Sequence, residues 1–282
     1  MAKFGVQMMM LKTKVEEEGI YNVMKKIKDI GFTSLEISQI PMTAENVAQM
    51  QRACKDFDME IGALSAATEP MFPGMESLST HYDKIVADCK ALNCNFLRIG
   101  MMPFNVLGNK DAFVAFAKKC DDYATKLAEE GIKLYYHNHH VEFIKYDGQI
   151  LLDILKEETT HLGFEIDVHW AQRAGVNPVE LIKKYAGRLD LVHLKDYRIA
   201  EPNFEDVDFK DVPTVMQRFI QVIQFAEIGE GNLDFKAIVD ASLVADAKYL
   251  FIEQDDTYGK DPYESLQISK DALVNLGYTN LL

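Results

Sequence analysis

The chain of 282 residues is close to the usual size of one α/β barrel, although length alone would also allow two domains. Hydrophobic residues make up 48% and charged residues 26%, which supplies a large core and a polar surface, as expected of a soluble globular protein. The formal net charge of -14 repels polyphosphate, so no nucleic-acid partner is expected and a small neutral or metal-bound substrate fits better.

The sequence shows no sign of export or of a membrane span. Its first residues lack a basic segment followed by a long apolar run, and no apolar stretch approaches the roughly 20 residues that cross a bilayer. The cysteines, which are Cys54, Cys89, Cys94 and Cys120, show no CxxC spacing and are expected to be buried or incidental thiols. We expect a cytoplasmic protein with no membrane partner.

Apolar β-rich runs alternate with segments of helical periodicity along the whole chain, which is typical of βα units around a parallel sheet. Eight strands are expected, at residues 3–10, 34–40, 60–66, 96–102, 133–139, 163–169, 190–196 and 249–255. Between the first two, apolar residues recur at helical spacing from Ile20 to Ile27, which predicts one buried helix stripe. The expected fold is a single (β/α)₈ TIM barrel over residues 1–282.

One long interruption separates the seventh strand from the last helix and strand. Residues 197–224 are rich in Asp, Glu, Pro and Phe, and they follow a strand on the side where a barrel carries its active site. This segment is a candidate lid over the active face, and a passive surface insertion is the alternative.

Polar residues gather at the ends of the expected strands, where a buried parallel strand would otherwise continue as an apolar run. They are Glu36 on the second strand, His137 and His139 on the fifth, Asp167 on the sixth, His193 and Lys195 on the seventh, and Glu253 on the eighth. Singly, each has an ordinary explanation, such as a satisfied core histidine or a helix N-cap. Together they would place several charges in one mouth, which a divalent cation would resolve. Carboxylate and imidazole ligands without thiolate suit Mn²⁺, Mg²⁺, Co²⁺ or Zn²⁺.

Five segments in this order resemble the xylose isomerase-like barrel superfamily, in the branch of sugar phosphate isomerases/epimerases. They are YYHNHHVEF, FEIDVHWAQRAGVNP, LVHLKDY, EIGEGNLDF and YLFIEQDD, and the resemblance runs over essentially the whole chain. It implies a barrel that holds one divalent metal ion through a carboxylate on strand five and through Asp167, His193 and Glu253.

The sequence departs from the epimerase pattern at two positions. Epimerases place a Glu at the end of strand five, where this chain has His137, and the nearest carboxylate is Glu142 just beyond the strand. We expect Glu142 to be the fourth ligand, which leaves His137 and His139 as bases, although an imidazole in its place is the alternative. Trp170 stands where epimerases have a substrate-contacting His, which places simple C3 epimerisation in doubt.

Three further residues are candidates for substrate contact. Lys195 lies two residues after His193, so it returns to the same face, where its ammonium could hold an oxyanion; an ion-paired or solvated Lys is the alternative. Arg98 and Glu36 could bind substrate hydroxyls, or they could form an internal pair that packs the barrel. Trp170 is expected to contact the substrate. The glycines of IGEGN lack the rest of a dinucleotide fingerprint.

A metal that chelates adjacent carbonyl and hydroxyl oxygens acidifies the intervening C–H, so a base can form an enediolate. The resemblance favours a metal-dependent isomerase or epimerase of a sugar or sugar derivative. A lyase, such as an inosose dehydratase or a keto-glycoside eliminase, is the alternative.

An apurinic endonuclease-like phosphodiesterase fits poorly with the acidic composition and seven histidines. A non-catalytic sugar-binding subunit is a further alternative. The expected partner is a small sugar or polyol, and a homo-oligomer is left open.

Overall fold

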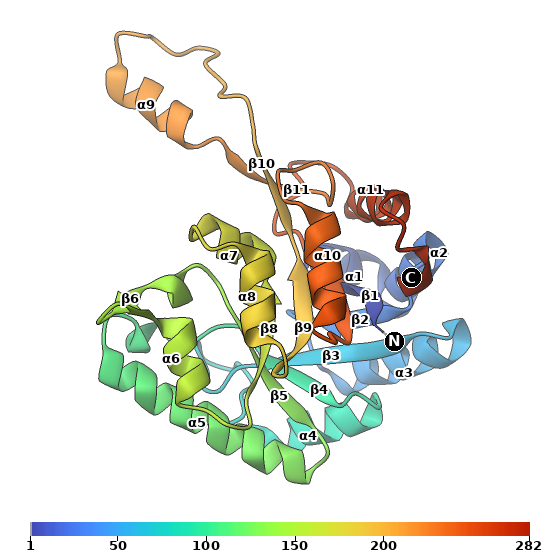
Figure 1. Ribbon diagram of the computed structural model, residues 1–282. Helices are drawn as coiled ribbons and strands as arrows, with labels where there is room; N and C mark the ends of the chain where they lie inside the picture. The colour runs from blue at the N-terminus through green and yellow to red at the C-terminus, as the bar shows by residue number, and fades with distance from the viewer. Residues whose placement is uncertain (1) are drawn as a thin grey trace.

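Eight parallel strands pair edge to edge into a closed barrel in the order β1-β12-β9-β8-β5-β4-β3-β2 (Figure 1). The structure is a computed structural model that describes residues 2–282. The barrel strands are β1 (Lys3–Gln7), β2 (Ser34–Ile37), β3 (Glu60–Ala66), β4 (Phe96–Ile99), β5 (Lys133–His137), β8 (Gly163–Asp167), β9 (Leu189–Leu194) and β12 (Tyr249–Ile252). The predicted (β/α)₈ barrel is therefore confirmed.

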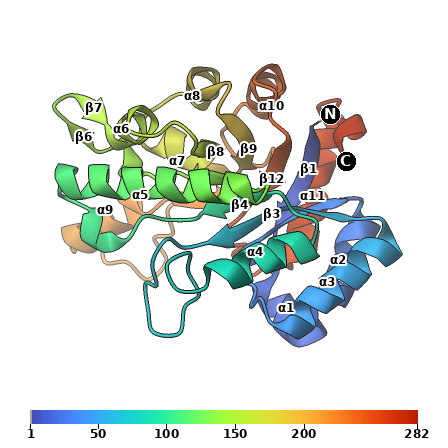
Figure 2. The ribbon, with the colours of Figure 1, turned by 90° about the horizontal axis from the view of Figure 1, so that it is seen from below.

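Helices surround the barrel on its outside (Figure 2). They are α1 (Lys12–Glu18), α2 (Ile20–Ile30), α3 (Ala44–Phe57), α4 (Tyr82–Ala91), α5 (Lys110–Glu129), α6 (Leu151–Glu157), α7 (Val168–Arg173), α8 (Pro178–Tyr185), α10 (Phe235–Val244) and α11 (Pro262–Asn275). Short 3₁₀ turns are η1 (Met8–Leu11), η2 (Phe104–Val106), η3 (Val141–Phe143) and η4 (Thr279–Leu281). Helix α2 buries Ile20, Val23, Met24 and Ile27, which is the predicted stripe.

Most strands end two or three residues earlier than the sequence pattern predicted. Residues 8–10, for example, leave the ladder and enter η1, and the Asp167 side chain caps α7 at the point where β8 ends. The ladder ends here because polar side chains take over the backbone groups that would otherwise pair with a neighbouring strand. The residues expected at the last positions of these strands therefore lie beyond the barrel ladder, in loops or in the elements η1, α7 and β10 (Asp196–Ile199) that follow it.

The barrel interior changes from aromatic to polar along its axis. Near the N-terminal strand ends, the ring of Phe96 lies edge-on to Tyr135 and Tyr249, at centroid distances of 5.2 and 5.8 Å. Phe251 stacks on Tyr249 in the same group. Towards the C-terminal ends the inward positions become Glu, Arg, His and Asp. The aromatic layer closes the bottom of the barrel, so the polar residues are accessible only from the mouth.

The segment after β9 forms an arm instead of a compact loop. An antiparallel ribbon of β10 (Asp196–Ile199) and β11 (Ile223–Ala226) carries helix α9 (Val212–Ile220) at its far end. Figure 1 shows α9 projecting away from the barrel. A smaller hairpin, β6 (Lys145–Tyr146) and β7 (Gln149–Ile150), precedes α6. Among the helices of residues 2–282, none has the length and apolarity required to cross a bilayer.

Replacement of Gly5 tests the packing of the barrel interior. A Cβ added at Gly5 would lie 2.6 Å from Phe251 Cδ1 and 2.8 Å from the backbone oxygen of Ser34. Because that oxygen belongs to the paired strand β2, it cannot move away freely. Gly5→Ala should therefore lower the free energy of unfolding by about 1–3 kcal/mol, as overpacked cores do, when measured by urea denaturation.

Gly131→Asn is the control, because Gly131 has a φ of +77° and no atom within 4 Å of an added Cβ. Asn tolerates this conformation, so the loss should stay below about 1 kcal/mol. Equal losses in the two variants would contradict the packing explanation for Gly5.

Candidate functional site

The mouth of the barrel contains a cavity of about 680 Å³. Polar side chains line one part of it, and they are Gln7, Ser38, Gln39, Ser65, Glu76, Arg98, His137, His139, Glu253 and Asp255. An apolar part is lined by Met9, Met71, Phe72, Met75 and Met101. No residue of 197–224 is among the described residues that line it, so the expected lid does not cover the cavity in this conformation. A polar floor with an apolar wall is typical of a small-molecule site.

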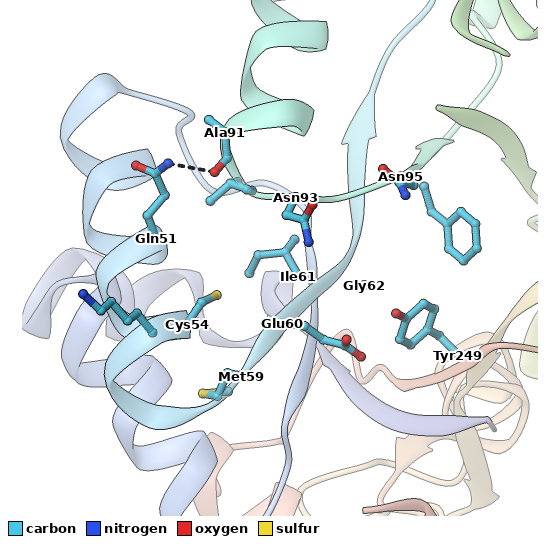
Figure 3. Close-up of a pocket in the computed structure, with 13 residues that line it drawn as sticks. Gln51, Cys54, Met59, Glu60, Ile61, Gly62, Ala91, Asn93, Asn95 and Tyr249 are labelled. Atoms are coloured by element: carbon cyan, nitrogen blue, oxygen red, sulfur yellow. Dashed lines mark hydrogen bonds between the residues drawn. The ribbon is translucent and has the colours of Figure 1, made fainter. Parts of the chain in front are cut away.

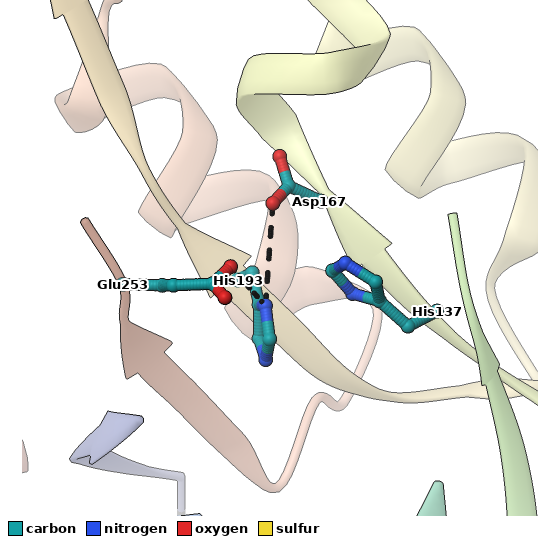
Figure 4. A group of neighbouring side chains, drawn as sticks. All are labelled: His137, Asp167, His193 and Glu253. Atoms are coloured by element: carbon teal, nitrogen blue, oxygen red, sulfur yellow. Dashed lines mark hydrogen bonds and ion pairs between the residues drawn. The ribbon is translucent and has the colours of Figure 1, made fainter. Parts of the chain in front are cut away.

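Four buried side chains from four strands converge at the floor of this mouth (Figure 4). His137, Asp167, His193 and Glu253 each offer one ligand atom, and these atoms lie within 4.8 Å of one another. Asp167 serves two purposes: its Oδ1 accepts a 2.9 Å hydrogen bond from the Trp170 backbone, and its Oδ2 has no hydrogen-bond partner among the described residues. One oxygen of the Asp167 carboxylate therefore caps the helix, and the other remains available to the cluster.

A second charged layer lies beneath this group. Arg98 Nε donates a 2.7 Å hydrogen bond to Glu36 Oε1 and lies 3.2 Å from Glu165 Oε2. His193 Nε2 lies 3.1 Å from Glu36 Oε2 and 3.2 Å from Glu165 Oε1. Glu36 is thus fully buried and forms an internal pair with Arg98, which was the alternative to substrate binding. Arg98 also lines the cavity.

Glu165 was not among the predicted site residues. Its position could have been inferred, because the alternation in FEID places Glu165 and Asp167 on the same face of β8, two residues apart. Gln7 was also missed, and its amide donates a 2.8 Å hydrogen bond to Glu253 Oε1. No polar run at the end of β1 marked this residue.

Lys195 is buried between three carboxylates. Its Nζ lies 2.8 Å from Glu253 Oε2, 2.9 Å from Asp255 Oδ2 and 3.5 Å from Asp167 Oδ2. These carboxylates raise the pKa of Lys195 although burial opposes them, so the ammonium stays charged. The side chain shares the face of His193, as the spacing predicted.

The charges of the two layers do not balance. The five carboxylates face two permanently charged side chains, Arg98 and Lys195, and the imidazole of His193. Burial lowers the pKa of His193, but the neighbouring carboxylates outweigh burial and raise it well above its usual value, so this ring carries a proton. These carboxylates are Glu36, Glu165, Asp167, Glu253 and Asp255. Burial raises the pKa of Asp167 to about 6, and burial together with the Glu36 charge raises that of Glu165 to about 8. The cluster therefore takes up positive charge as protons when no other cation is present.

Glu142 lies outside the cluster, contrary to the expectation that it completes the ligand set. Its Oε1 accepts a 2.6 Å hydrogen bond from the Tyr136 hydroxyl, and its Oε2 accepts a 2.7 Å bond from the His139 backbone. Tyr136 faces the outer helices and packs on Phe116, so its partner carboxylate lies behind β5. The strand-five member of the cluster is the imidazole of His137.

His139 and Trp170 stand above the cluster. The ring of His139 lines the cavity, and its Nδ1 has no hydrogen-bond partner among the described residues. Burial, followed by the charge of Lys195, lowers the pKa of His139 to about 3, so its imidazole is neutral at pH 7. Trp170 lies 5.6 Å from His139 between ring centroids, and its ring is 5.3 Å from Lys195 Nζ. Of these three side chains, only His139 is among the described residues that line the cavity, so substrate contact by Trp170 and Lys195 stays a prediction.

Another cavity of about 490 Å³ opens at the opposite end of the barrel (Figure 3). It is lined near the starts of β3, β4 and β12, where Glu60 pairs with Lys3 at 3.0 Å. This end of a barrel supports stability, whereas chemistry belongs to the C-terminal ends of the strands. The candidate site is therefore the mouth.

Several known proteins are similar to this chain in sequence or in fold. Inosose dehydratase of Clostridium botulinum is 27% identical over 135 residues, which are 46% of this chain and 42% of that protein. The matched part thus spans less than half of this curated relative. A sugar phosphate isomerase/epimerase of Parabacteroides distasonis superposes with a TM-score of 0.73 at 20% identity, covering 97% of this chain and 98% of that one. An L-ribulose 3-epimerase gives a TM-score of 0.68 at 15% identity, covering 100% and 96%.

These structural similarities establish the fold and leave the reaction open, because the identities are low. The family model described as xylose isomerase-like TIM barrel matches residues 24–264, which is most of the chain. The chain belongs to the xylose isomerase-like TIM barrel family.

Proposed function

We propose that this protein is a divalent-metal-dependent enzyme that removes a proton beside the carbonyl of a sugar or polyol derivative, and acts as an isomerase or epimerase. The observation that carries the proposal is the buried cluster of His137, Asp167, His193 and Glu253, which has a surplus of negative charge at the floor of an open cavity. The ring of His139, whose Nδ1 has no hydrogen-bond partner among the described residues, lies 4.8 Å from that of His137 between centroids.

The donor set fits a metal ion. Two imidazoles and two carboxylates suit Mn²⁺, Mg²⁺, Co²⁺ or Zn²⁺, and the unpartnered Oδ2 of Asp167 is the kind of buried atom that a cation would satisfy. His193 would be oriented by Glu36 and Glu165, which lie 3.1 and 3.2 Å from its Nε2 and leave Nδ1 facing the cluster. A bound divalent ion would polarise the carbonyl and the neighbouring hydroxyl of the substrate.

The side chains around the cavity would divide the remaining work. His139 would accept the carbon-bound proton at its ring nitrogen, because it is neutral and faces the cavity. Lys195 would stabilise negative charge on the substrate oxygen, and its three carboxylate partners keep it protonated. Trp170 packs beside His139 and would hold that ring in place, and the methionines that line the cavity would exclude water.

A lyase is the second candidate, and the similarity to inosose dehydratase favours it. Loss of water after proton removal needs one base and one acid near the leaving hydroxyl. His139 and the Lys195 ammonium, which both lie beside the ring of Trp170, would provide one of each. An epimerase would need bases on both faces of the substrate, and the strand-five carboxylate that could serve as one is absent at position 137.

Substitution of the cluster should separate ligands from supporting residues. Glu253→Gln and His137→Gln should each lose most of the bound metal, since each removes one of the four donors, when metal content is measured by plasma emission spectrometry after dialysis. Glu142→Gln should keep its metal and instead lower the free energy of unfolding by about 1–3 kcal/mol, as expected when a buried hydrogen-bonded charge is removed.

Glu142→Gln and His137→Gln thus form a matched pair on the same strand and loop. Loss of metal from Glu142→Gln with retention in His137→Gln would exchange their roles and make Glu142 the ligand.

Metal affinity should depend on pH in a defined direction. Burial raises the pKa of Asp167 to about 6, so below that pH a proton competes with the metal for the carboxylate, and above it the carboxylate is free. The dissociation constant of Mn²⁺, followed by calorimetry, should rise by about tenfold for each pH unit below 6 per displaced proton. A dissociation constant that stays flat from pH 7 to pH 5 would contradict binding at Asp167.

Proton removal from carbon should be visible as isotope exchange. Metal-loaded protein in deuterated water should introduce deuterium into recovered substrate or product from a panel of ketoses, inososes and keto-glycosides, as read by mass spectrometry and NMR. Deuterium in a product that keeps the atomic composition of the substrate would identify an isomerase or epimerase, and loss of water or of the glycoside would identify the lyase. Turnover without exchange, together with no rate difference for carbon-deuterated substrate, would exclude the proposed step.

The same assay tests His139. His139→Asn should lower turnover by about a hundredfold or more with metal content retained, in line with general-base contributions. His161→Asn is the control, because His161 is exposed and contacts Asp121 far from the cavity lining. Full activity in His139→Asn would assign proton transfer to another group.

A further inference from the structure

The arm carries an apolar surface that its own chain does not cover. This arm surface consists of Ile199, Phe209, Val212, Met216, Phe219, Ile220 and Ile223, each between 43% and 67% exposed. Helix α9 contributes four of these residues and has no buried residue of its own. An arm that exposes this many large hydrophobic side chains is unlike an ordinary solvated loop.

Helix α9 gains little stability from its own chain beyond an N-cap, in which the Asp211 carboxylate accepts hydrogen bonds from the Thr214 backbone and hydroxyl. It has nine residues, and isolated helices shorter than about 12–15 residues are marginal in water. Most helical stability in proteins comes from packing an apolar face against another element. The apolar face of α9 therefore needs a partner from outside this chain.

The other exposed hydrophobic residues lie at the same end of the barrel. Outside the arm, large exposed hydrophobic side chains among residues 2–282 are Met71, Phe72, Phe104, Ile144, Leu243, Val244 and Tyr258. Five of them follow the C-terminal ends of β3, β4, β5 or β12, and only Leu243 and Val244, at the end of α10, lie at the opposite end. The exposed apolar surface is thus concentrated on the mouth end and its arm.

The size and charge of this surface indicate the kind of partner. With roughly 150–200 Å² for each large apolar side chain, the exposure of the arm surface corresponds to about 600–800 Å², close to the ~800 Å² that each partner buries in a standard interface. Residues 200–222 carry five carboxylates and two basic side chains, which disfavours an anionic membrane or a nucleic acid.

We infer that two copies of this chain associate through their mouth ends, so that the arm surface of each copy packs on the mouth end of the other copy. In a dimer with two-fold symmetry both copies use the same surfaces. The arm surface of the first copy can therefore contact the apolar mouth loops of the second, and the arm surface of the second can contact the mouth loops of the first. The base of the arm reaches the candidate site, because Phe225 stacks on His169 at 4.9 Å and lies 5.7 Å from Lys195 Nζ. Association would therefore order the wall of the cavity that the arm supports.

Sedimentation velocity over a concentration series tests this inference. The wild-type chain should sediment at twice the monomer mass of 32.0 kDa. Met216→Glu with Phe219→Glu should raise the dimer dissociation constant by about thirtyfold or more, as expected for residues at the centre of an interface. Val244→Glu places the same charge on an 86% exposed side chain outside the arm and should leave the dimer unchanged.

Hydrogen exchange of wild-type protein gives a second measurement that needs no variant. The amides of α9 should be protected at concentrations where the dimer forms and lose that protection on dilution. A wild-type monomer at every concentration, or a double variant that dimerises as tightly as the wild type, would overturn the inference. If α9 is protected only when phosphatidylcholine vesicles are present, the arm surface binds lipid, and the inference of a dimer is overturned as well.

Discussion

The surplus of buried negative charge inside the barrel is the constraint on which the rest of this structure depends. Carboxylates from β2, β8 and β12 point towards one axis because alternate residues of every barrel strand must face inward. Arg98 compensates the lower layer, where it contacts Glu36 and Glu165. In the upper layer Lys195 contacts three carboxylates at once. A polar barrel interior of this kind is stable only if each layer is supplied with positive charge, and the upper layer is the one that remains open to ligands from solution.

The position of the polar layers follows from what lies beneath them. Phe96, Tyr135, Tyr249 and Phe251 fill the N-terminal end of the barrel with contacting rings. Water therefore reaches the charged residues from the mouth alone, and the electrostatic interactions there are stronger than they would be at the surface. The same burial lowers the pKa of His139 and raises that of Asp167, so a neutral base and a cation-seeking carboxylate lie in one cavity. A neutral base beside a carboxylate that attracts a cation is what the proposed enolisation would need, whereas simple sugar binding would need neither.

The arm and the candidate site are parts of one continuous segment. Strand β9 contributes His193, the next residues contribute Lys195 and Asp196, and the chain then enters the ribbon that carries α9. Asp196 fixes the start of the ribbon, since its carboxylate accepts hydrogen bonds from the backbone of Gly229, Gly231 and Leu233. An interface on the arm would thus act on a rigidly anchored base next to the ammonium of the site. This arrangement gives an apolar extension far from the candidate cluster a direct connection to the cavity.

The sequence by itself determined the barrel and much of the candidate cluster. The alternation of apolar runs with helical periodicity predicted eight strands, and their polar C-terminal ends were expected to meet at one mouth because parallel barrel strands end on the same face. The resemblance to the family singled out Asp167, His193 and Glu253 among these residues, and the structure brings the three together. The tertiary structure decided what local geometry does not control. Glu142 lies beyond the end of β5, where the turn of the chain and the hydroxyl of Tyr136 set its direction. The pairing of Arg98 with Glu36 joins residues 62 positions apart, and the projection of α9 depends on a ribbon that forms only when distant strands pair.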